Sequence, residues 1–144
     1  MLVSQLHDIV QDSLSNELYS NAAFYAERLL NESESDEIRH LLAKAYLGNF
    51  IIFFILGEGK YHKAFSILKD TKINKCRYLF AQTCVKLNRL VEAERALLTD
   101  KHYSKSILSK DVEGVIPNGP AGYFLLGIIA EKLVNLKNIL LKYK

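Results

Sequence analysis

The chain has 144 residues, of which 49% are hydrophobic and 24% charged, and its formal net charge is +3. This length fits one domain with a sizeable core, while two prolines and seven glycines are too few for a disordered chain and favour long helices. Residues 1–60 hold 4 lysines and arginines against 9 acids, whereas residues 61–144 hold 15 against 7. This polarity favours head-to-tail contact between copies or an acidic partner, and the scattered lysines argue against nucleic acid.

The opening segment, MLVSQLHDIVQDSL, predicts an amphipathic helix and lacks the charged start and unbroken apolar block of a signal peptide. Its apolar residues follow the i, i+4, i+7, i+8 spacing of one helix face: Leu2, Leu6, Ile9 and Val10. A second stripe runs from Leu18 to Leu29. Residues 2–31 are therefore predicted to form a helical hairpin.

The following segment, NESESDE, supplies serines and acids that suit a helix start. Further apolar stripes predict hairpins over roughly 35–70, 73–98 and 120–144, separated by one loop over 99–119. No segment alternates polar and apolar residues as a half-buried strand does. We therefore expect an all-α fold in which residues 1–144 form a single domain.

The predicted hairpins resemble one another, which indicates an internal repeat. The segments RHLLAKAY (39–46), RYLFAQTC (77–84) and YFLLGIIA (123–130) each place a large apolar residue before a small one. Two helices cross closely only where small side chains let the ridge of one enter the groove of the other. This spacing is typical of a tetratricopeptide superhelix of antiparallel hairpins. The predicted packing residues are Ala22, Leu42, Ala43, Tyr46, Ala64, Phe80, Ala81, Cys84, Ala93, Leu126 and Gly127.

One stretch breaks the repeat. Eighteen residues separate Tyr46 from Ala64, where the pattern needs about nine, and the extra residues read NFIIFFILG. Spanning a membrane takes about 20 apolar residues, and the run Phe50–Leu56 is too short for that. Because exposure would make it an aggregation hazard, we expect the run to extend the first helix of its repeat. It would then be buried in the chain's own core or against a partner copy.

Two segments carry a family resemblance: AERLLNESESDEIRHLLAKAYLG (26–48) and GKYHKAFSILKDTKINKCRYLFAQTCVKLNRLVEAERALL (59–98). They resemble, in the same order, the amino-terminal tetratricopeptide domain of the anaphase-promoting complex (cyclosome) scaffold of the cell-division-cycle 27 type. The resemblance covers nearly the whole chain outside the insertion. The chain departs from the family in its apolar insertion, its lysine-rich end, and repeats that lack the usual tryptophan and proline.

The resemblance implies a non-catalytic part of a multi-subunit ubiquitin ligase that drives mitotic exit. The implied partners are a second copy and other subunits of the ligase, without nucleic acid or membrane, in the nucleus and cytoplasm. In this family the first helices of one copy lie in the groove of the other. Capture of activator tails belongs to carboxy-terminal repeats and is not assigned here. The expected dimer interface consists of Leu2, Leu6, Ile9, Val10, Tyr78 and Phe124.

The sequence offers little for chemistry. The four histidines are too far apart for a metal-ligand pattern, and GEGK lacks the spacing of a phosphate-binding loop. Cys76 and Cys84 suggest a reducing compartment and two small buried thiols on one helix. We therefore expect no catalytic, cofactor-binding or metal-binding residues and no cofactor.

The alternative function is a peptide-binding adapter of the cochaperone type. Such adapters grip a terminal carboxylate with lysine, asparagine and arginine side chains on the inner face of the first helices. The corresponding positions are His40, Lys44, Tyr78, Gln82, Phe124 and Ile128. Of these only Lys44 suits a carboxylate clamp, and the increasingly apolar face fits a bound helix better.

Overall fold

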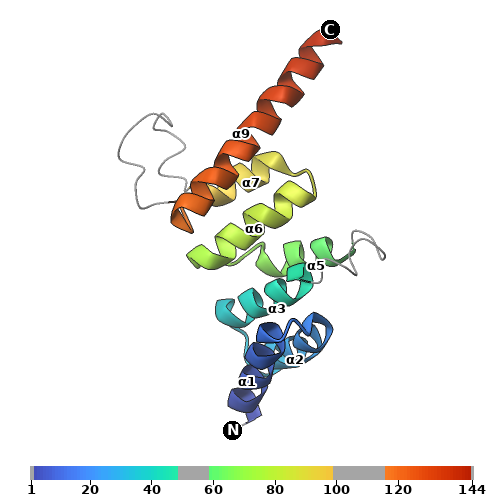
Figure 1. The fold of residues 1–144 in the computed structure, drawn as a ribbon, viewed down its shortest axis with the longest axis vertical. Coiled ribbons are helices and arrows are strands. Elements are labelled where there is room, and N and C mark those ends of the chain that lie inside the picture. The colour runs from blue at the N-terminus through green and yellow to red at the C-terminus, as the bar shows by residue number, and fades with distance from the viewer. Residues whose placement is uncertain (1, 49–58, 99–115, 144) are drawn as a thin grey trace.

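The computed structural model describes residues 2–48, 59–98 and 116–143, and every regular element in these ranges is an α-helix (Figure 1). The helices are α1 (Leu2–Ser15), α2 (Tyr19–Glu32), α3 (Asp36–Gly48), α5 (Gly59–Leu68), α6 (Asn74–Lys86), α7 (Leu90–Leu97) and α9 (Gly119–Lys142). The all-α prediction is confirmed. The apolar run Phe50–Leu56 and most of the loop predicted over 99–119 lie outside the described residues.

Consecutive helices pack as hairpins: α1 with α2, α3 with α5, and α6 with α7. Each hairpin also packs on the next, through α2 on α3, α5 on α6 and α7 on α9. The first helices of the hairpins touch in the order α1, α3, α6, α9, and we call these four helices the first-helix row. Figure 1 shows the resulting elongated stack, with the amino and carboxyl termini at opposite ends. This is the tetratricopeptide arrangement that the repeat predicted.

The first and third hairpins turn in the same way. Glu17 and Asn88 both adopt left-handed backbone, with φ of 57° and 58°. The next residue then donates its N–H to a carbonyl five positions back, Leu18 to Ser13 at 2.8 Å and Arg89 to Cys84 at 2.7 Å. This bond satisfies a carbonyl that the end of the helix leaves free. Two distant segments therefore share one turn geometry, which supports their reading as repeats.

The helices approach one another at small side chains. The predicted small positions are completely buried, with 0% exposure: Ala22, Ala43, Ala64, Ala81, Cys84 and Ala93. Large side chains close the core around them, including Leu42, at 2% exposure, and Tyr46, at 8%. Phe80 and Leu126 are partly buried against the core that α6, α7 and α9 share. The hairpins are thus held by tight contact at alanine and cysteine.

The predicted fourth hairpin, over 120–144, is instead one helix of 24 residues, α9. Pro120 lies in its first turn, where a missing N–H costs nothing. A side chain at Gly122 would lie 2.1 Å from the carbonyl oxygen of Pro117, so this position requires glycine. The prediction was wrong because no glycine or proline follows Gly127 to end the helix.

Gly127 is also corrected as a packing position. A Cβ atom built there meets nothing within 4 Å among the described residues. The neighbouring face of α9, with Leu125 and Ile129 buried against α7, carries the contact instead. In the part of the chain that the structure describes, no helix is long and apolar enough to span a bilayer.

We predict that Ala93→Leu destabilises the fold by about 1–3 kcal/mol, because extra carbons have no room in a position with no exposed area. Urea unfolding measures the change in free energy. The matched control is Ala130→Leu, at an exposed position of α9, which we expect to change stability by no more than about 0.5 kcal/mol. Equal effects of the two substitutions would contradict the tight-contact account.

Candidate functional site

A groove of about 380 Å³ opens on the first-helix row between α3 and α6, and we call it the α3–α6 groove. Its lining residues are His40, Lys44, Asn74, Lys75, Tyr78, Leu79 and Asn118. Three of them, His40, Lys44 and Tyr78, are inner-face positions that the sequence predicted. The others were missed, and no local pattern reveals that Asn118, just before α9, lies beside residues of α3 and α6.

The groove has one lysine on each side, Lys44 from α3 and Lys75 from α6. Burial lowers the pKa of His40, and the charges of Lys75 and Lys44 lower it further against the opposing effect of Glu37. His40 is therefore neutral at pH 7. Lys75 forms an ion pair with Glu37 that joins α6 to α3. The groove consequently combines polar and cationic groups with one aromatic ring.

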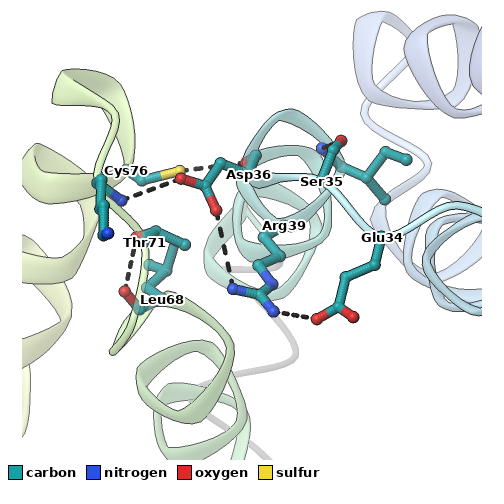
Figure 2. Close-up of polar contacts among 9 residues, drawn as sticks. Glu34, Ser35, Asp36, Arg39, Leu68, Thr71 and Cys76 are labelled. Carbon is teal, nitrogen blue, oxygen red and sulfur yellow. Dashed lines mark hydrogen bonds and ion pairs between the residues drawn. The ribbon is translucent and has the colours of Figure 1, made fainter.

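A polar junction holds α3 against α6 next to the groove (Figure 2). The Asp36 carboxylate accepts a hydrogen bond from the backbone N–H of Lys72 at 3.0 Å, and Cys76 Sγ donates to the Asp36 carbonyl at 3.3 Å. Arg39 pairs with Asp36 at 3.7 Å and also with Glu34. The two bonds from Lys72 and Cys76 tie the start of α3 to the start of α6, so they set the separation of the two helices that flank the groove.

The start of α3 is itself capped. Ser35 Oγ accepts a hydrogen bond from the N–H of Ile38 at 3.3 Å, as the serines of NESESDE predicted. Asp36 and Glu37 lie in the first turn, where negative charge is favoured by the helix dipole. One short acidic segment thus begins the helix and forms the junction.

Two of the residues predicted for the dimer interface lie in the chain's own core. Leu6, at 8% exposure, packs with Leu29 and Ile38, and Val10, at 0%, packs in the core that α1 shares with α2 and α3. Their assignment to a partner is therefore corrected. The apolar stripe on α1 was assigned as a whole to a partner, but Leu6 and Val10 pack inside the chain, against α2 and α3.

The remaining predicted interface residues are accessible. Leu2 and Ile9 are 58% and 41% exposed on α1, and Phe124 is 73% exposed on α9. Tyr78 lines the α3–α6 groove and accepts a hydrogen bond from Gln82 Nε2 at 3.3 Å. All four lie on helices of the first-helix row. This arrangement suits contact with a protein surface.

The two cysteines lack the character of nucleophiles. Burial raises the pKa of the Cys84 thiol to about 12 and that of Cys76 to about 11. A reactive cysteine needs a lowered pKa, because the thiolate is the attacking species. Among the described residues, no three side chains of His, Cys, Asp or Glu converge as metal ligands would.

A family model described as "Anaphase-promoting complex, cyclosome, subunit 3" matches residues 15–99. The "Cell division cycle protein 27 homolog A" of Arabidopsis thaliana is 36% identical over 129 residues, which are 90% of this chain and 16% of that protein. Homolog B of the same plant is 35% identical over 141 residues, 98% of this chain and 16% of the relative. The Homo sapiens homolog is 36% identical over 61% of this chain and 10% of its own length. The chain thus spans about a sixth of the length of the plant relatives.

We predict that both thiols react slowly in the folded chain. At pH 8, alkylation by iodoacetamide is expected to be at least about a hundredfold slower than in urea, because the raised pKa values leave little thiolate. Mass spectrometry of timed samples measures the rates, and Cys76→Ala and Cys84→Ala separate the two sites. Equal rates with and without urea would contradict the burial of the thiols.

Proposed function

We propose that this chain, which belongs to the anaphase-promoting complex, cyclosome, subunit 3 family, acts as a scaffold. The likeness to cell division cycle protein 27 homologues and the hairpin stack identify it as a tetratricopeptide scaffold segment of such a subunit. In this role the chain catalyses no reaction and holds neighbouring proteins in place. The raised pKa values of its two cysteines support that part of the proposal.

The first proposed neighbour is a second copy of the chain. Leu2 and Ile9 are seven residues apart and therefore lie on nearly the same face of α1, at the edge of its buried stripe. Both are exposed on the row that carries the α3–α6 groove, and this is the observation on which the proposal rests. In a twofold pair, α1 of each copy lies against the row of the other.

The energetic argument for pairing is burial of apolar surface. Covering a leucine or an isoleucine side chain recovers about 1.5–3 kcal/mol when exposure is complete, and these two are only about half exposed. Leu2 and Ile9 alone therefore contribute about 1–3 kcal/mol per copy. Tyr78 and Phe124 supply further contact area, since aromatic side chains are enriched at interfaces.

The proposal extends to the wider setting. Other subunits of the anaphase-promoting complex are proposed as further partners, and neither nucleic acid nor membrane takes part. The proposed location is the nucleus and the cytoplasm. These parts follow from the family resemblance, and the uneven distribution of charge along the chain agrees with contacts between proteins.

A peptide-binding adapter is the second candidate. It is favoured by Lys44, Asn74 and Asn118 in the α3–α6 groove, which offer hydrogen-bond donors to a carboxylate. The adapter would be a monomer that binds short peptides through a free carboxyl terminus. Calorimetry with a peptide and its terminal amide distinguishes this function, because only the adapter prefers the free carboxylate.

We predict that Leu2→Glu combined with Ile9→Glu converts a dimer into a folded monomer. The substitutions remove the apolar area that pairing would bury and place two carboxylates against the apolar contacts of the partner's first-helix row, which is costly, while both positions are exposed within the chain. Light scattering coupled to size-exclusion chromatography measures the molar mass, and circular dichroism reports whether the helices remain.

The matched control is Leu18→Glu combined with Val91→Glu, which adds the same charge at apolar positions that are 52% and 49% exposed. We expect this variant to remain a dimer. A monomeric parent chain, or a dimer that survives substitution of Leu2 and Ile9, would contradict the proposed pairing.

A further inference from the structure

A second hollow, of about 520 Å³, lies between the end of α5, the turn before α6, and α7, and we call it the α5–α7 cleft. Helix α6 contributes Arg77 and Phe80 to this cleft but Asn74 and Tyr78 to the α3–α6 groove. Lys75 and Leu79 of α6 also line the groove. At about 100° of rotation per residue, the groove residues of α6 taken together lie on nearly the opposite face from Arg77 and Phe80. The cleft is therefore a separate surface from the groove proposed for pairing.

The cleft carries an excess of positive charge. Lys69, Lys72, Arg77 and Arg95 line it, against a single acid, Glu92. Glu92 already pairs with Arg89 at 3.2 Å. The Arg77 guanidinium is also engaged, because it donates to the carbonyls of Ala96 at 3.0 Å and Leu97 at 3.2 Å.

The three other cations are available. In the described ranges no carboxylate forms an ion pair with Lys69, Lys72 or Arg95. All three side chains are exposed and border the same hollow. Cations near the carboxyl ends of α5 and α7 are stabilised by the helix dipoles. That interaction alone does not require them to surround an apolar cleft.

The lining between these cations is apolar, and neighbouring side chains hold it in position. Leu68 is 1% exposed, and Ala96 lines the cleft from α7. The Phe80 ring packs on Phe65 with ring centroids 5.1 Å apart, and the Arg89 guanidinium lies 4.4 Å from the centroid of Phe65. An apolar side chain entering the cleft therefore meets a wall that is already in place.

We propose that the α5–α7 cleft binds an acidic peptide segment of a partner protein. Carboxylates of the segment lie near Lys69, Lys72 and Arg95, while one of its apolar side chains lies against Phe80 and Ala96. A peptide fits better than a nucleic acid because the lining between the cations is apolar and suits a side chain, whereas a nucleic acid presents mainly phosphate and sugar to such a surface. A single hollow of about 520 Å³ also gives a phosphate backbone no continuous track of cations to follow.

The test uses fluorescence anisotropy of a fluorescein-labelled peptide made of glutamates and leucines, titrated with the 144-residue chain. A second peptide has glutamine in place of every glutamate. We expect the glutamate peptide to bind, with an affinity that falls as salt is added, and the glutamine peptide to bind at least about tenfold more weakly, ~1.4 kcal/mol.

The cleft variant carries Lys69→Glu, Lys72→Glu and Arg95→Glu, and we expect it to bind the glutamate peptide at least about tenfold more weakly than the parent chain. The matched control carries Lys132→Glu, Lys137→Glu and Lys142→Glu, which reverse the same number of exposed charges on α9. The control is expected to change the affinity by no more than about twofold.

The proposal is overturned if the parent chain does not bind the glutamate peptide, or if both triple variants lose affinity equally. It is also overturned if a single-stranded oligonucleotide binds while the peptide does not. The variant with Leu2→Glu and Ile9→Glu distinguishes this proposal from the pairing proposal. It leaves the cleft intact, so it is expected to bind the peptide as the parent chain does even if pairing is lost.

Discussion

Close approach of helices is the constraint on which this structure depends. Where two helices cross in the stack, the side chain between them is a methyl group or a thiol with no exposed area, as at Ala43, Ala81 and Ala93. A larger side chain would separate the axes and remove the contacts that leucine and tyrosine make on either side. Each hairpin then offers its second helix to the next hairpin, and the stack continues by the same contact.

This packing leaves two kinds of surface for binding. The first-helix row has a groove between α3 and α6 whose flanking helices are held by the Asp36 junction. The opposite face of α6 contributes to the cleft between α5 and α7. One helix, α6, therefore contributes to both proposed binding surfaces, while Ala81 and Cys84, further along the same helix, form part of the core. A scaffold can in this way contact different neighbours without a separate domain for each.

The sequence predicted the helices and their tight contacts because both depend on local spacing. A period of 3.6 residues marks the buried faces, and the large–small pairs mark where helices meet, as Leu42 with Ala43 does. The spacing does not say which surface covers an apolar stripe, and so Leu6 and Val10 were assigned to a partner instead of the first hairpin. It also did not show that α9 continues past Leu133, since only the absence of a breaker carries that information.

The groove and the junction depend on contacts between distant segments, which periodicity does not report. Asn118 lines the groove although it is distant in sequence from α3 and α6, and the carboxylate of Asp36 accepts a hydrogen bond from a backbone N–H that lies 36 residues further along the chain. The acids of NESESDE gave a signal for a helix start, but nothing in their spacing indicated the second helix that they join. The polar contacts between repeats are therefore the part of the site that could not be predicted from the sequence.

The linear stack also has a dynamic consequence. The main contacts of every hairpin are with the hairpins before and after it, so the free energy that holds each one is nearly a local quantity. Opening of one hairpin therefore leaves distant hairpins largely packed, and the exchange of amide hydrogens with solvent is governed hairpin by hairpin. The stack therefore opens in steps, and a partner that covers one hairpin slows the opening of that hairpin and of its immediate neighbours.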